Sequence, residues 1–263
     1  YKTDTSHEVF GAIGYLSEIN LFKKVRENSK RFLTPKMLIR YAPGHMREET
    51  SKTRLNHSNI FSLDRLNTNK NFESGLSATL GFDYEIEQSN KKLDFSIGQI
   101  INEKENQNMP SSSSLDQRFS DVVGYSQLEI NDNIKINYNF ALDQNYGQLN
   151  YNELGANLDF NPIKFDFNYL QEKEHLGDQE YFKGTIGFSP NEYGLFSAET
   201  KRNLITNSAE YYNLSYEYTN DCLRAGLVYR REFYNDSELE PEDSLMFKIT
   251  LTPFGDINSP SFN

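Results

Sequence analysis

Apolar and polar residues alternate along the segment NDNIKINYNFALDQN, which covers residues 131–145. Every second position from Ile134 to Leu142 is Ile, Tyr, Phe or Leu, and the positions between them are Lys, Asn and Ala. This period of two predicts a β-strand with one apolar and one polar face. In a soluble sheet the apolar face packs on a core. In an outer-membrane barrel it meets lipid, and the polar face lines a wet lumen.

The same alternation recurs almost to the end of the chain and predicts about a dozen strands. They are expected within His7–Val25 and at Leu33–Tyr41, Ala78–Ile86, Leu93–Ile101, Val122–Ile130, Ile134–Leu142, Leu149–Phe160, Ile163–Tyr169, Phe182–Phe188, Tyr193–Lys201, Tyr211–Tyr218, Leu223–Phe233 and Leu245–Pro253. Long polar segments, above all Ala42–Asn71 and Asn102–Ser120, alternate with short turns such as Asn161-Pro162 and Asn220-Asp221. Short turns that alternate with long loops are typical of an up-and-down barrel.

Strand length bears on the choice between a membrane barrel and a soluble sheet. Soluble strands average about 5–6 residues, whereas outer-membrane strands need about 9–11. Many alternating segments approach the longer figure, so we expect an all-β, antiparallel, up-and-down transmembrane β-barrel. A large soluble β-sandwich would show the same contrast between faces, and the pattern alone leaves that alternative open.

The composition is compatible with a membrane barrel and argues against nucleic acid as a binding partner. The mean hydropathy is −0.72, and no apolar run approaches the roughly 20 residues of a spanning helix. A barrel needs no such run, because only alternate residues face lipid. Aromatic residues make up 14% of the chain, which argues against disorder. The formal charge of −11 makes nucleic acid an unsuitable partner.

Catalytic and metal-binding patterns do not emerge from the residues. The histidines His7, His45, His57 and His175 have no metal-ligand spacing. The acidic segment Asn235–Ser244 lacks the central glycine of a calcium loop. We therefore expect no enzyme, no metal and no cofactor.

One cluster of basic residues lies in the first long polar segment and comprises Arg40, Arg47, Lys52 and Arg54. On an outer loop these side chains could contact sugar phosphates, because guanidinium groups match phosphate geometry. The alternative is ordinary mixed loop charge.

The single cysteine and the start of the sequence give two further expectations. Cys222 is the single cysteine, so no disulfide forms within the chain. The first ten residues, YKTDTSHEVF, have no basic-then-apolar signal pattern and no clear start for a first element. We expect a piece of a longer protein.

Three segments carry a resemblance to a known family. They are RFLTPKMLIRYAPGHMR at Arg31–Arg47; NIFSLDRL at Asn59–Leu66, followed by FESGLSATLGFDYE at Phe72–Glu85; and YYNLSYEYTNDCLRAGLVYRREFY at Tyr211–Tyr234. In order and spacing they resemble the LPS-assembly outer-membrane protein family LptD, also called OstA, across nearly the whole chain.

The resemblance implies a lipopolysaccharide translocon in the bacterial outer membrane. This chain would be the C-terminal part, about half of a larger barrel, without the N-terminal jellyroll and first barrel strands. Lipopolysaccharide would arrive from a periplasmic LptA-like bridge, an LptE-like lipoprotein would fill the lumen, and an inner-membrane ATPase would supply the energy. A porin or hydrophobic-substrate channel and a soluble carbohydrate-binding β-sandwich remain the alternatives.

Two further expectations follow from the resemblance. A closed barrel offers an amphiphile no exit, because every strand edge is paired; in the family a weak seam beside the last strand is the lateral gate. Here that strand would run from Ser244 to Pro253, with the seam residues Leu245, Met246, Phe247, Lys248, Ile249, Thr250, Leu251, Thr252 and Pro253. The resemblance implies that Cys222 would bridge to the missing N-terminal part, and an unpaired thiol is the alternative. Some members have two adjacent cysteines at this place, so the single cysteine here argues against regulation by disulfide exchange.

Overall fold

The computed structural model describes residues 11–50, 54–66, 71–173, 175–233, 242–251 and 255–258. Within these ranges the regular secondary structure consists of β-strands and one 3-10 helix, η1 (Ser111–Ser113), which lies in the second long loop. The strands are β1 (Ile13–Glu18), β2 (Leu21–Arg26), β3 (Ser29–Ala42), β4 (Gly75–Gln88), β5 (Lys91–Asn102), β6 (Val122–Asn131), β7 (Ile134–Leu142), β8 (Leu149–Phe160), β9 (Ile163–Glu172), β10 (Gln179–Phe188), β11 (Gly194–Asn203), β12 (Ser208–Thr219), β13 (Leu223–Glu232), β14 (Glu242–Leu251) and β15 (Gly255–Asn258).

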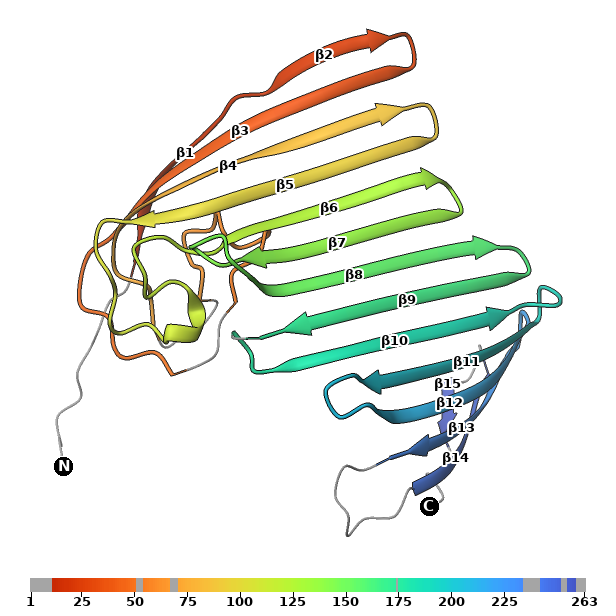
Figure 1. Cartoon of the computed structure of the whole chain (residues 1–263). Helices are drawn as coiled ribbons and strands as arrows, with labels where there is room; N and C mark the ends of the chain where they lie inside the picture. The colour runs from red at the N-terminus through yellow and green to blue at the C-terminus, as the bar shows by residue number, and fades with distance from the viewer. Residues whose placement is uncertain are drawn as a thin grey trace, which may run out of the picture. The chain divides into compact units, whose positions relative to one another are not determined.

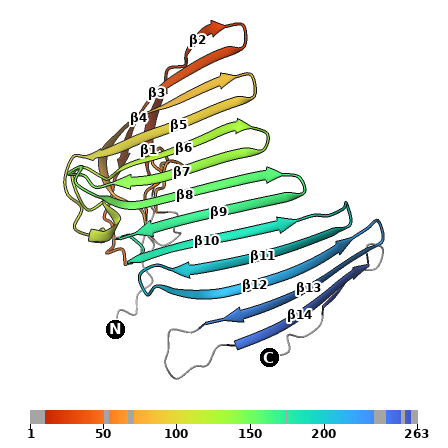
Figure 2. The ribbon, with the colours of Figure 1, turned by 45° about the vertical axis from the view of Figure 1, so that its right-hand side comes forward.

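The strands form a single antiparallel meander (Figure 1). The order runs from β1 through β3 to β15 in sequence, with β2 beside β3, and most strands span 9 to 14 residues. Figure 2 shows the same succession of hairpins from a second side. The fold is therefore the all-β antiparallel meander expected from the sequence. A single sheet also shows that the β-sandwich alternative is wrong, since a sandwich needs a second packed sheet.

The first alternating segment is divided into β1 and β2 opposite a proline of β3. Both strands pair with β3, and the backbone N–H of Ile19 donates to the Pro35 carbonyl at 3.2 Å. In an antiparallel ladder a residue directs its N–H and C=O toward the same neighbour. Pro35 has no N–H on that side, so the ladder cannot continue there. Thr34 and Asn20 join their side chains across the break at 3.0 Å.

Asparagine side chains stabilise several short turns, including the expected turn at Asn220-Asp221. The Asn220 carboxamide oxygen accepts the backbone N–H groups of Cys222 and Leu223, and Asn191 accepts those of Tyr193 and Gly194. Such contacts satisfy backbone donors that a tight turn would otherwise leave unpaired. These turns fix the register of the hairpins that they connect.

The chain divides into two compact units, which we describe separately. Unit 1 is Tyr1–Leu128, Tyr138–Asn152 and Glu172–Asp178, and unit 2 is Glu129–Asn137, Glu153–Gln171 and Gln179–Asn263. The buried apolar side chains among the described residues all belong to unit 1. Some lie on strands, such as Leu38 and Ile100, and others on the two long loops, such as Ile60 and Leu115. The core therefore forms where loops cover one face of the sheet.

The C-terminal end corrects one expectation. β14 starts at Glu242 rather than Ser244, and it is followed by β15, which pairs with Lys248–Leu251. β14 is thus not the last strand of the order. Thr252 and Pro253, which we assigned to this strand, lie outside the described residues.

Candidate functional site

The two faces of the sheet in unit 1 have opposite environments. On β4 the side chain of Thr79 is fully buried beneath the loops, whereas its neighbour Leu80 is 48% exposed. On β3 Arg40 is 1% exposed and Ile39 is 44% exposed. The apolar parity is thus the face without a protein cover, and the more polar parity faces the loops. An uncovered apolar face is what a membrane barrel presents to lipid.

In unit 2 the strand register also brings apolar side chains together on one exposed face of the sheet. Phe196 on β11, Leu227 on β13 and Phe247 on β14 are between 45% and 49% exposed. Phe196 packs against Tyr216 of the next strand at a ring-centroid distance of 4.5 Å. Such cross-strand aromatic pairs stabilise a sheet without a core behind it.

A segment of the β3–β4 loop packs against the sheet at positions occupied by glycine. Gly81 and Gly98 are paired across β4 and β5, and a Cβ on Gly81 would stand 2.9 Å from the ring of Phe61. A Cβ on Gly14 would stand 2.6 Å from the Leu63 side chain. The absence of side chains at these positions makes room for the loop. The expected loop segment NIFSLDRL is therefore a structural insert on the polar face.

Two buried arginines connect this insert to the wall. Arg40 donates to the carbonyl oxygens of Leu63 and Glu73, both at 2.7 Å. Arg65 forms a buried ion pair with the Glu73 carboxylate at 3.1 Å and donates to the hydroxyls of Ser77 and Thr79. Burying a guanidinium group is costly unless its donors are paired. The loop can therefore occupy this position only because Arg40 and Arg65 form these contacts.

A second charged cluster links four chain segments of unit 1. The Arg54 Nη1 lies 2.7 Å from Glu172 Oε2, and the Arg54 guanidinium stacks 3.6 Å from the centre of the Tyr151 ring. His175 Nε2 lies 2.9 Å from Asp121 Oδ2. The backbone N–H of His175 donates to Glu172 Oε1 at 3.0 Å, and its ring Nδ1 lies 3.4 Å from the same oxygen at ion-pair distance.

The environment of His175 favours its charged form. Burial alone lowers the pKa of this imidazole, but hydrogen bonds to Asp121 and Glu172 and the charges of the two carboxylates outweigh burial and raise the pKa to about 9. At neutral pH the ring is therefore protonated. Two carboxylates then face two cations, and the cluster is neutral.

The polar face of unit 2 carries its own network. Glu199 of β11 is paired with Lys183 of β10 at 2.9 Å and accepts hydrogen bonds from Tyr211 and Asn213 of β12. Next to it lies a hollow of about 430 Å³, lined mainly by Asn, Asp, Lys, Thr and Glu side chains. This surface offers many hydroxyl, amide and charged groups to a hydrophilic ligand.

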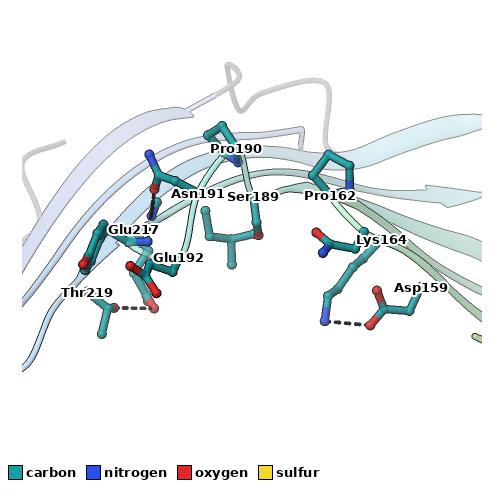
Figure 3. Close-up of a pocket in the computed structure, with 13 residues that line it drawn as sticks. Asp159, Pro162, Lys164, Ser189, Pro190, Asn191, Glu192, Glu217 and Thr219 are labelled. Carbon is teal, nitrogen blue, oxygen red and sulfur yellow. Dashed lines mark hydrogen bonds and ion pairs between the residues drawn. The ribbon is translucent and has the colours of Figure 1, made fainter. Parts of the chain in front are cut away.

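A larger groove of about 770 Å³ lies at the short turns of unit 2 (Figure 3). Pro162 and Pro190 come from two of these turns, and Glu217 comes from β12. Lys164 is paired with Asp159 at 2.8 Å on one side of the groove. Both side chains are about half exposed, so this contact is a solvated pair with little effect on stability.

Metal ligands do not gather in the described ranges. No group of three or more His, Cys, Asp or Glu residues there could hold a metal ion. No helix in the described part of the chain is long and apolar enough to cross a membrane.

The family model for LptD, described as LPS transport system D, matches residues 20–216. The chain belongs to the LptD family. This family is a transport barrel and not an enzyme, and together with the strand pattern it places the chain in the bacterial outer membrane. The sequence resemblance to this family is thus confirmed.

Solved porins are among the structures to which this LptD-family chain is similar. Two engineered variants of the Rhodopseudomonas blastica porin are 8% identical to it; one match covers 95% of this chain and 91% of the porin at a TM-score of 0.42, and the other covers 94% and 95% at 0.35. None of the curated proteins compared with the chain matches it by sequence.

The basic residues that were expected to contact phosphates have different environments in the structure. Arg40 is buried and used by the loop insert, so it does not present its guanidinium to a ligand, and that expectation is wrong. Arg54 is 21% exposed and paired with Glu172. Arg47 is exposed, and Lys52 lies outside the described residues.

The remaining site predictions keep their standing as predictions. Cys222 is an exposed free thiol in the turn between β12 and β13, and no partner for a bridge lies within this chain, because it has no second cysteine. On β14, Phe247 pairs with Leu227 and Lys248 with Gly226, and the role of this strand as a gate seam stays a prediction.

Sequence reasoning missed the residues that hold the loops. Arg65, Glu73, Asp121, Glu172 and His175 are separated by up to 110 positions, so no local sequence pattern connects them. His175 lies in the β9–β10 loop and is only 2% exposed, and the spacing of the histidines gave no sign of this burial. The one available signal was the apolar island NIFSLDRL inside a polar segment.

Proposed function

We propose that this LptD-family chain is part of a translocon that inserts lipopolysaccharide into the outer leaflet. The single observation that carries the proposal is the match to the LPS transport system D family over residues 20–216. The exposed apolar face and the hydrophilic opposite face support it, because lipid A and the sugars of one molecule need these two environments.

The exit for the lipid would be a seam beside β14. β14 pairs with β13 on one side and, over Lys248–Leu251, with β15 on the other. Opening a ladder beside β14 would connect the hydrophilic face with the bilayer. An LptE-like lipoprotein in the lumen and an LptA-like periplasmic bridge would be the protein partners.

The test is photocrosslinking in cells from the full-length parent protein. A photoreactive residue in place of Lys248 or Thr250 should crosslink lipopolysaccharide, and the yield should fall when the ATP supply of transport is stopped. The matched control is Phe247, on the opposite face of the same strand. Its crosslinks to leaflet lipid should persist without ATP.

The competing function is a diffusion porin with a permanently closed seam. It predicts no energy-dependent lipopolysaccharide crosslink at Lys248 or Thr250. That result, with normal folding of the variants, would count against the translocon.

A further inference from the structure

The cluster of Arg54, Glu172, His175 and Asp121 joins segments that are far apart in the chain. Arg54 belongs to the β3–β4 loop, Asp121 ends the β5–β6 loop, Glu172 ends β9 and His175 lies in the β9–β10 loop. Every contact in the cluster is between side chains or loop backbone, and among the described residues no strand ladder joins the β3–β4 loop to β9. The charged side chains therefore connect the β3–β4 loop to the C-terminal end of β9.

Three of the four side chains in the cluster are buried, so the balance of charge among them strongly affects its stability. Asp121 and His175 are each 2% exposed, and Glu172 is 1% exposed. With His175 protonated, two negative and two positive groups are present. Without that proton, two carboxylates share Arg54 alone, and an uncompensated buried charge is strongly unfavourable.

We propose that these four side chains form a latch that holds the β3–β4 loop against the strand ends, and that loss of the proton from His175 releases it. The latch would control access through the loop-covered face, and it does not depend on which molecule the barrel transports. Its release leaves the strand ladders intact.

The direction of the pH dependence follows from the groups that face the ring. Asp121 and Glu172 face it directly, Arg54 lies behind Glu172, and Asn150, which donates to Asp121 at 3.0 Å, is neutral. The pKa of His175 is about 9 in the latched state against an ordinary value of 6.5. The stabilisation is therefore complete below about pH 6.5, declines as the pH rises, and is lost above about pH 9.

The experiment measures hydrogen exchange of the full-length protein in detergent micelles between pH 6.5 and 10. Protection factors of peptides that cover residues 54–66, corrected for intrinsic exchange rates, should fall by up to about tenfold per pH unit until about pH 9. Peptides from β5 should keep their protection. Constant protection of residues 54–66 across this range would overturn the proposal.

Two variants locate the proton. His175→Gln leaves a net negative cluster, so residues 54–66 should be weakly protected at every pH. Combining it with Asp121→Asn restores neutrality, so the double variant should regain protection without any pH dependence. If the double variant still loses protection near pH 9, the responsible proton is not on His175 and the latch is refuted, whether or not His175→Gln alone folds.

Discussion

Individual charged residues show how this chain uses burial on its polar face. Arg65 and Glu73 have side-chain exposures of 0% and 3%, and the Ser77 and Thr79 hydroxyls accept further hydrogen bonds from the two Nη groups of the guanidinium. Lys92 and Glu85 also form an ion pair, at 3.1 Å, but both are exposed by a third or more. The two ion pairs therefore contribute differently to stability, because water screens the Lys92–Glu85 pair and not the Arg65–Glu73 pair.

Replacing Arg65 by Met should cost about 3–5 kcal/mol, because the buried Glu73 carboxylate loses its partner. Lys92→Met should cost about 0–1 kcal/mol, because its pair is solvated. Urea unfolding in micelles, followed by the gel mobility of folded and unfolded protein, measures both. Equal shifts for the two variants would mean that the Arg65 pair is not buried in the native protein.

At the scale of elements, the loop between β3 and β4 depends on the strands beneath it. Paired glycines on β4 and β5 lower the surface of the sheet where Ile60 and Phe61 lie. Gly98 would place a Cβ 3.1 Å from the Ile60 side chain. A glycine in a strand interior ordinarily weakens the strand, so here close approach of the loop explains the residue.

Gly81→Ala should therefore destabilise the protein by about 1–3 kcal/mol, because the new methyl group meets the Ile97 carbonyl and the Phe61 ring. The matched control is Gly226→Ala on β13, where a Cβ meets nothing within 4 Å. There the lower flexibility of the unfolded chain should leave stability unchanged or raised by up to about 1 kcal/mol. Thermal unfolding in micelles compares the two, and destabilisation of equal size would contradict the seating of the loop.

At the scale of the whole molecule, the orientation of the faces relative to lipid governs function. A chain with only 37% hydrophobic residues can present apolar surface to a bilayer, because alternate residues are sorted onto one face. In the proposed function, lipid contact on that face and water on the other would give an amphiphilic cargo two surfaces along the same strands.

Tryptophan fluorescence can test this orientation directly, because the chain contains no Trp. A single Trp at Phe196, on the apolar face, should be strongly quenched by lipids with brominated acyl chains. A Trp at the adjacent Ser197, on the polar face and at nearly the same depth, should be quenched weakly and respond instead to a water-soluble quencher. The reverse pattern would show that the faces are inverted.

The sequence by itself determined the strands, their length, the tight turns and the contrast between faces. These depend on residue types at neighbouring positions, which a period of two and asparagine turns report directly. It did not separate a lipid-facing apolar surface from a packed core, since both show one parity of Phe, Tyr, Leu and Ile. That the chain is the C-terminal part of a larger barrel, and that Cys222 is bridged, stay predictions.

Only the tertiary structure decided what the long loops do. It placed Arg40 beneath the loop insert and brought Arg54, Asp121, Glu172 and His175 together from four segments. Contacts of this kind depend on where loops return over the sheet, and local periodicity carries no information about such returns. Burial then changed the chemistry, because the same charged residues behave as solvated loop groups in water and as structural partners when water is excluded.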